Sequence, residues 1–187
     1  MRIEQLRKEY DIVVQWVAFP LHPDTPEDGL TLEQLFVGRN LDIGQMMQRL
    51  HKAAKDLGLP FGDRKKTFNS RLAQELSKWA ESLGKGDQFH GAMFSAYFVD
   101  GTNIGKPDEL IRIAGSIGLP KDQAKAVLDG RSFRQAVDAD WKLAHTLGIT
   151  AVPTFVVNNE KLVGAQSYEA LEQFLIGQGG RKRNGTR

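Results

Sequence analysis

The sequence of 187 residues contains no cysteine. Disulfide bonds, thiolate metal sites and cysteine nucleophiles are therefore excluded for these residues. No apolar run approaches the about 20 residues that a membrane-spanning helix needs. The opening residues, MRIEQLRKEY, also lack the apolar centre of a secretory signal. As written, the chain is expected to be soluble and cytoplasmic, with no membrane partner.

An excess of charge is also missing, because the formal net charge is only +2. Four basic residues fall within the last seven, RKRNGTR, so residues 1–180 carry a slight negative excess. A basic run of this kind can contact nucleic acid, but a solvated chain end explains it more simply. We therefore predict a flexible basic tail over residues 181–187 and no nucleic-acid partner.

What the chain does contain is 41% hydrophobic residues, enough for the core of one domain. Residues 1–9 have the pattern of the last turns of a helix. The run IVVQWVAF, Ile12 to Phe19, predicts a largely buried strand. Strand character returns at Thr154 to Val157, followed by a hairpin turn at Asn158 to Lys161 and a second short strand, LVG.

Between these β-segments, apolar stripes at helical spacing predict a block of helices over residues 31–147. Thr31 and Gln34 match a capping box, and three further N-caps are predicted, at Asp42, Ser70 and Asp87. Ser167 is the predicted cap of a final helix. We interpret residues 31–147 as an all-helical insertion within a single α/β domain that spans residues 1–187.

Pro153 interrupts the start of the best β-forming run, ITAVPTFVVNN. Proline cannot donate to a strand ladder, and it favours extended geometry at the residue before it, Val152. From the residues alone, a trans proline at the start of an edge strand is the simpler interpretation, since only about 5–6% of X-Pro bonds in folded proteins are cis.

A set of stretches along nearly the whole chain resembles DsbA-like thioredoxin-fold proteins. The nearest branch holds FrnE-like dithiol-disulfide isomerases of polyketide biosynthesis, with 2-hydroxychromene-2-carboxylate isomerases and kappa-class glutathione transferases as relatives. The stretches are FPLHPDTPEDG, GLPFGDRKKTFNSRLAQELSKWA, MFSAYFVDGTNIGK, ELIRIAGSIGLP, VDADWKLAHTLGITAVPTF and GAQSYEALEQFL. The resemblance implies a thioredoxin-like α/β fold with a large helical insertion, whose first strand and redox-helix N-terminus are missing from this sequence.

The resemblance further implies that Val152-Pro153 is a cis peptide beside the redox site. Val152 would offer its backbone to an extended substrate, as an added strand does. Ala151 and Thr154 would flank that groove.

His22 and Asn69 are further candidates for the groove, although a solvated histidine and the entry of a helix explain these two residues as well. Asp138, Asp140 and His145 lie on one predicted helix, but their spacing does not bring all three onto one face. No metal site is predicted.

Thiol-disulfide exchange needs a thiolate and a second, resolving cysteine. In the resembled family this C-x-x-C lies upstream of the point where the printed sequence begins, so we expect an N-terminally shortened version of a longer redox protein. The first functional hypothesis is a thiol-disulfide oxidoreductase or isomerase without a cofactor, acting on a protein or small-molecule substrate. For the chain as written, no dithiol activity is expected.

Two alternative functional hypotheses remain open. One is a glutathione-dependent isomerase or transferase of the hydroxychromene-carboxylate and kappa type, in which a serine stands in place of the first cysteine. The other is a non-catalytic thioredoxin-like binding module. The sequence leaves the oligomeric state open, with a homodimer among the options.

Overall fold

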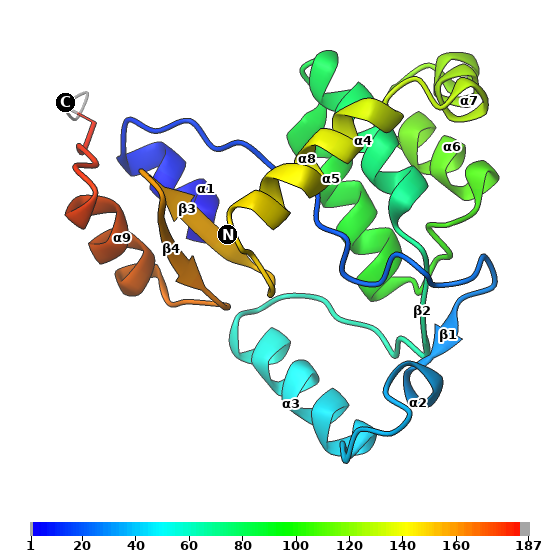
Figure 1. Cartoon of the computed structure of the whole chain (residues 1–187), viewed down its shortest axis with the longest axis horizontal. Coiled ribbons are helices and arrows are strands. Elements are labelled where there is room, and N and C mark those ends of the chain that lie inside the picture. The colour runs from blue at the N-terminus through cyan, green and yellow to red at the C-terminus, as the bar shows by residue number, and fades with distance from the viewer. Residues whose placement is uncertain (1, 184–187) are drawn as a thin grey trace. The chain divides into compact units, whose positions relative to one another are not determined.

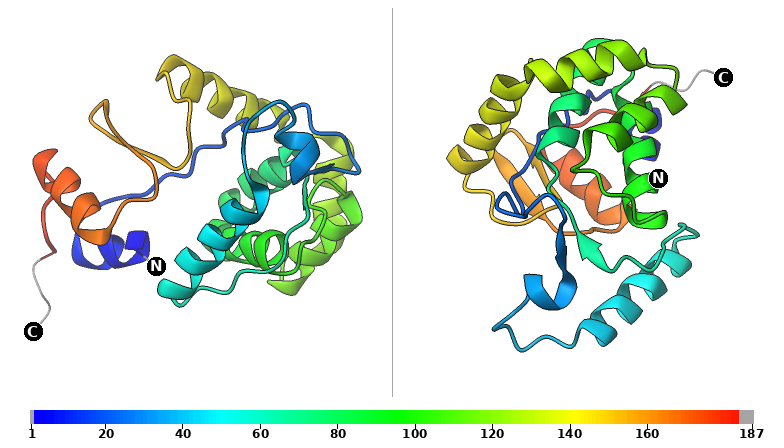
Figure 2. Two further views of the ribbon diagram at one scale, coloured as in Figure 1. Left: turned by 90° about the horizontal axis from the view of Figure 1, so that it is seen from below. Right: turned by 90° about the vertical axis from the view of Figure 1, so that its right-hand side faces the viewer.

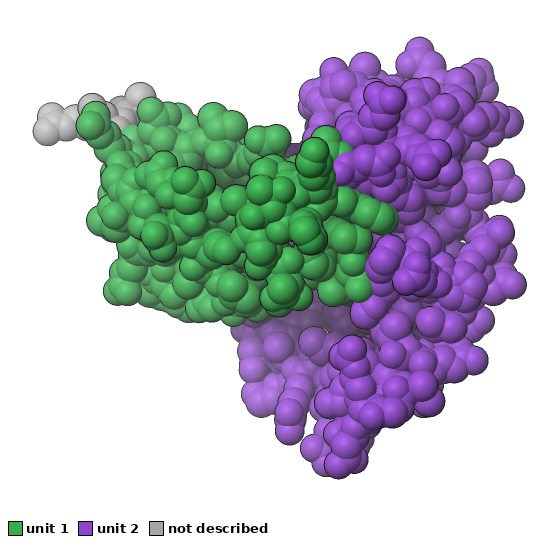
Figure 3. Space-filling view, viewed as in Figure 1, with its two compact units in different colours: residues 1–21, 139–187 green, residues 22–138 purple. Residues whose placement is uncertain are grey.

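The structure is a computed structural model that describes residues 2–183 (Figure 1). The chain divides into two compact units, coloured separately in Figure 3. Unit 1 comprises residues 1–21 and 139–187, and unit 2 comprises residues 22–138. Within the described residues, no helix is long and apolar enough to cross a membrane.

Unit 1 is built on a β-hairpin and two helices, with part of a third. Its elements are α1 (Arg2–Glu9), β3 (Thr154–Val157), β4 (Glu160–Val163) and α9 (Tyr168–Gly177), together with the end of α8 (Arg134–Thr146). The two strands pair antiparallel, with Phe155 opposite Leu162. Asn158 and Asn159 form the turn with positive φ angles of 48° and 69°, as a tight hairpin turn requires. The predicted hairpin is confirmed, but its turn is shorter than predicted, because Glu160 and Lys161 belong to β4.

The core of unit 1 lies where α1 and α9 pack against the hairpin. Leu6, Tyr10, Leu171 and Leu175 are buried there, against Phe155 and Leu162. The predicted cap of α9 is confirmed, because the Ser167 side chain accepts a hydrogen bond from the backbone N–H of Ala170. This cap fixes the point at which the chain turns from β4 into α9.

The strand predicted over Ile12 to Phe19 is wrong for this structure. These residues adopt no strand and appear in Figures 1 and 2 as an extended trace that leaves α1. Val13 is 96% exposed. A strand needs a neighbouring strand to pair its backbone groups, and among the described residues none pairs with this segment.

The predicted free tail is also wrong for its first three residues. The backbone N–H of Asp11 donates to the carbonyl of Arg181, and that of Arg183 donates to Glu9. Lys182 forms an ion pair with Glu172, 3.1 Å away. Residues 184–187, the rest of the predicted tail, lie outside the described residues. Residues 181–183 are thus held against the C-terminus of α1 by backbone pairing that charge patterning does not reveal.

Unit 2 is mainly helical. Its elements are β1 (Leu30–Thr31), α2 (Leu32–Leu35), α3 (Ile43–Asp56), β2 (Lys66–Thr67), α4 (Arg71–Ser82), α5 (Gly86–Phe94), the π-helix η1 (Ser95–Val99), α6 (Pro107–Ser116), α7 (Lys121–Gly130) and the first residues of α8. The strands β1 and β2 form a short antiparallel pair. The core gathers on α4 to α7, where Leu76, Phe89 and Leu110 are fully buried.

The N-termini of the helices in unit 2 show which of the predicted caps form. The capping box of Thr31 and Gln34 and the Asp42 cap are confirmed. Ser70 stands at the predicted N-cap position of α4 but makes no side-chain cap hydrogen bond. Asp87 lies inside the first turn of α5, whose N-cap is Lys85, so the cap predicted at Asp87 is wrong.

Candidate functional site

The proline loop of unit 1 joins α8 to β3. The Val152-Pro153 peptide is cis. The Pro153 carbonyl accepts a hydrogen bond of 2.8 Å from the backbone N–H of Gly164, which extends the β3–β4 ladder by one step. The Thr154 hydroxyl donates to the Ala151 carbonyl at 2.6 Å. These two bonds fix the backbone on both sides of Val152.

Val152 itself is open. The residue is 44% exposed. Among the described residues, nothing hydrogen-bonds to its backbone N–H or carbonyl. β3 pairs with β4 on one edge, and no described strand pairs with its other edge. Free backbone groups along a strand edge are what an added strand uses to bind.

His22 and Asn69 belong to unit 2, and the structure brings them to one loop. The carbonyl of His22 accepts hydrogen bonds from the backbone and hydroxyl of Thr25. The Asn69 amide donates to the carbonyls of Pro23 and Thr25. Its oxygen accepts from the backbone N–H of Arg71, so Asn69 clamps the loop to the first turn of α4. Helix entry accounts for the bond from Arg71, whereas the two bonds to Pro23 and Thr25 hold the distant loop.

The environment of the His22 ring disfavours its charged form. Burial lowers the pKa of His22, and the nearby guanidinium groups of Arg39 and Arg64 lower it further. The ring is thus held neutral to lower pH than an exposed histidine. A neutral imidazole can accept or donate a hydrogen bond, but its role in unit 2 stays a prediction.

The acidic residues of α8 have structural partners. Asp138 pairs with Arg71 at 2.7 Å. Asp140 accepts a hydrogen bond of 2.8 Å from the backbone N–H of Ala18, which ties the extended segment to α8. Among the described residues, no group of three or more histidine or acidic side chains is arranged to hold a metal ion.

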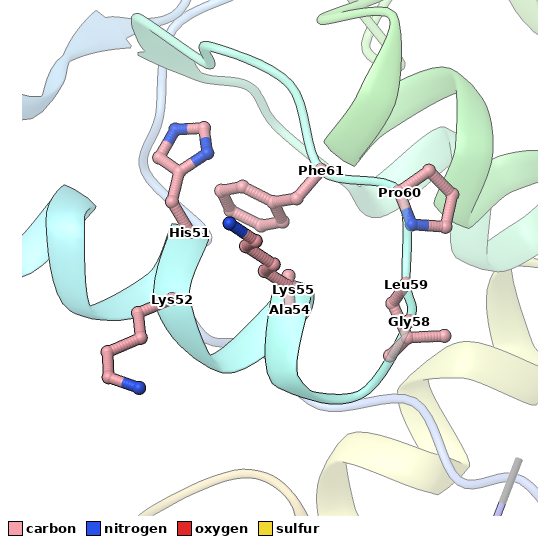
Figure 4. Close-up of a pocket in the computed structure, with 8 residues that line it drawn as sticks. All are labelled: His51, Lys52, Ala54, Lys55, Gly58, Leu59, Pro60 and Phe61. Carbon is pink, nitrogen blue, oxygen red and sulfur yellow. The ribbon is translucent and has the colours of Figure 1, made fainter.

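One surface feature was not singled out from the sequence. A hollow of about 790 Å³ lies between the C-terminal half of α3 and the loop that follows it (Figure 4). We call it the α3 hollow. Its lining residues are His51, Lys52, Ala54, Lys55, Gly58, Leu59, Pro60 and Phe61. The basic residues Arg49, Lys52 and Lys55, three residues apart on the same predicted helix, were the signal that could have identified it.

Taken together, unit 1 presents an open strand edge beside a proline loop, on a hairpin flanked by helices. This arrangement is typical of thioredoxin-like folds. A family model of the DsbA-like thioredoxin domain matches residues 1–176. The chain therefore belongs to the DsbA-like thioredoxin domain family, and the predicted fold class, thioredoxin-like with a helical insertion, is confirmed.

Three known proteins illustrate the relationship. An uncharacterized protein of Bacillus subtilis strain 168, YwbO, is 27% identical over 92% of this chain and 85% of its own. The crystal structure of the probable DsbA oxidoreductase SCO1869 from Streptomyces coelicolor matches with a TM-score of 0.87 and 24% identity, over 100% of this chain and 86% of its own. A 2-hydroxychromene-2-carboxylate isomerase structure matches with a TM-score of 0.72 and 16% identity, over 95% of this chain and 85% of its own.

Proposed function

We propose that these residues are the substrate-aligning part of a DsbA-like thiol-disulfide oxidoreductase or isomerase. The observation that carries the proposal is the unpaired backbone of Val152 beside the open edge of β3. An extended peptide can add there as a strand, with main-chain hydrogen bonds supplying affinity for substrates of varied sequence. Membership of the DsbA-like family supports this assignment.

The thiol chemistry itself needs groups that these 187 residues lack, because the sequence has no cysteine. In such an exchange, a thiolate attacks one sulfur of the substrate disulfide, and the other sulfur leaves as a thiolate. The second thiol of the dithiol then displaces the substrate, which is released reduced while the dithiol becomes a disulfide. We propose that the dithiol lies upstream of Met1 in the natural polypeptide.

The aligning role can be tested on the chain as printed. The probe is S-carboxymethylated insulin B chain, an extended peptide without free thiols, added to ¹⁵N-labelled protein. We expect shifts of the amide signals of Val152 and the open edge of β3. A Val152→Pro variant removes the backbone donor and should weaken binding, whereas Val152→Ala keeps the donor and should not. Shifts confined to other surfaces, or equal binding by both variants, would contradict the proposal.

A different measurement distinguishes the glutathione-dependent alternative from the proposed dithiol oxidoreductase. It predicts that the natural protein carries a serine where the first cysteine would stand and that it binds glutathione without reducing insulin. Reduction of insulin disulfides by the natural protein would exclude that alternative and the non-catalytic module together. The cytoplasmic location stays a prediction, which cell fractionation would check.

A further inference from the structure

The α3 hollow has fixed walls. The backbone N–H of Leu59 donates to the carbonyl of Ala54 at 2.9 Å, which folds the loop back onto the helix end. The N–H of Gly62 donates to the carbonyl of Phe98 at 2.8 Å. A Cβ at Gly62 would lie 2.1 Å from the Val99 carbonyl oxygen, so this close approach requires glycine. The loop between these two anchors forms one wall.

The aromatic ring of Phe61 is held within that wall. It meets the His51 ring edge to face, with the centroids 5.1 Å apart, and stacks on Phe98 at 6.1 Å. His51 is itself positioned by Asp63, whose carboxylate lies 3.1 Å from Nε2. Figure 4 shows the side chains of His51, Lys55 and Phe61 converging, while Lys52 points away from them. The hollow therefore combines a fixed aromatic surface with a nearby cation.

The charge around the hollow is unlike that of the rest of the chain. From Arg39 to Lys66 there are seven lysine and arginine residues but three acidic ones, although residues 1–180 as a whole carry a slight negative excess. Lys52 is paired with Asp56 at 2.8 Å. Lys55 forms no ion pair with any described residue. A single cation facing the hollow is thus left to interact with a ligand.

The apolar face of α3 is only partly covered, with Ile43, Met46 and Met47 half-buried. None of its fourteen residues is buried. Leu57 and Leu59, at the rim of the hollow, are 49% and 43% exposed. Apolar surface that the fold leaves uncovered around a concave site favours the burial of an apolar ligand body.

We propose that the α3 hollow binds an aromatic organic anion, with the carboxylate on Lys55 and the ring system against Phe61, Leu59 and Pro60. The volume of about 790 Å³ lies in the range of small-molecule sites, roughly 300–1,000 Å³. The positive charge selects an anion, and the ring wall selects a flat apolar body. This binding site is separate from the thiol chemistry proposed above and needs no cysteine.

The test uses two probes with the same ring system and nearly the same shape, the anion 2-naphthoate and the neutral 2-naphthamide. Calorimetric titration of the whole chain is expected to show that 2-naphthoate binds about threefold or more tightly than the amide, as a partly exposed ion pair allows. The preference should fall as salt is added, because screening weakens exposed charge pairs. Equal affinity for both probes, or no binding of 2-naphthoate, would overturn the proposal.

Variants locate the site. Lys55→Gln should lower the affinity for 2-naphthoate to the affinity for 2-naphthamide. The control is Lys142→Gln, which replaces an exposed lysine on α8 and should leave the affinities for both probes unchanged. Phe61→Leu should weaken the binding of both probes, since it removes the aromatic ring but keeps an apolar side chain. Circular dichroism would verify that each variant is folded. Unchanged binding by folded Lys55→Gln and Phe61→Leu proteins would place the anion elsewhere and refute the assignment.

Discussion

Replacing Glu75 by glutamine should destabilise unit 2 more than any single surface change. Glu75 is 1% exposed on α4. One carboxylate oxygen accepts from Arg71 Nε at 2.6 Å and from Arg131 Nη2 at 2.6 Å, and the other accepts from Arg131 Nε at 2.7 Å. A neutral glutamine places an N–H₂ group against one of these donors. It leaves Arg131 without its ion-pair partner and leaves Arg71 with Asp138 alone.

Removing one partner of a buried ion pair costs about 3–5 kcal/mol. Glutamine keeps one acceptor oxygen, so we expect a loss of about 3 kcal/mol for Glu75→Gln. A domain of this size is stable by only about 5–15 kcal/mol. With a urea slope of about 2 kcal/mol per molar, the midpoint should fall by roughly 1.5 M.

The assay can be confined to unit 2. Trp79 is the one tryptophan between residues 22 and 138, so a background with Trp16→Phe and Trp141→Phe reports the unfolding of this unit. The matched control is Glu81→Gln, whose carboxylate is a third exposed and pairs with Lys78 at 3.3 Å. We expect the control to cost less than 1 kcal/mol.

The pH dependence gives a second check on Glu75. Burial alone would raise the pKa of Glu75, but the hydrogen bonds and charges of Arg131 and Arg71 outweigh it and hold the pKa below its ordinary value. A lowered folded-state pKa adds stability above the unfolded value of about 4.3, and that stability is lost as the pH falls through the folded-state value. The gap between the wild type and Glu75→Gln should therefore narrow in acid. A cost below 1 kcal/mol at pH 7, or a gap that widens in acid, would refute the ion-pair account.

Two further substitutions probe smaller contacts by urea unfolding. Asn69→Ala removes the three hydrogen bonds that clamp loop 23–25 to α4, and we expect a loss of about 2 kcal/mol; Asn69→Asp, which keeps the helix-facing acceptor, should retain part of it. Ser167→Ala removes the cap of α9 and should cost about 1 kcal/mol, whereas Ser167→Thr should cost little. A stability equal to wild type for Asn69→Ala or Ser167→Ala would show that the corresponding bond contributes nothing.

The sequence was informative where structure is decided locally. The capping box at Thr31, the Asp42 and Ser167 caps and the hairpin turn at Asn158 each depend on neighbours within four residues. Their geometry follows from side-chain reach and backbone preference. These signals predicted the positions of the hairpin and of most helices, and the sequence resemblance predicted the family.

The failures involve partners distant in sequence. Ile12 to Phe19 has strand composition, but no described strand is beside it to complete a ladder. The tail residues Arg181 and Arg183 pair with Asp11 and Glu9, at and just after the end of α1, across 170 residues or more. The burial of the Glu75 carboxylate depends on Arg131, 56 residues away. The α3 hollow likewise depends on a loop that folds back onto its helix.

We propose that this chain aligns a substrate for a dithiol that its own 187 residues do not contain. The intact mass of the natural protein, measured before and after alkylation with iodoacetamide under reducing conditions, tests this proposal. We expect a mass above 20.9 kDa and the addition of two alkyl groups. A natural protein of 20.9 kDa that takes up no alkyl group would refute the proposal.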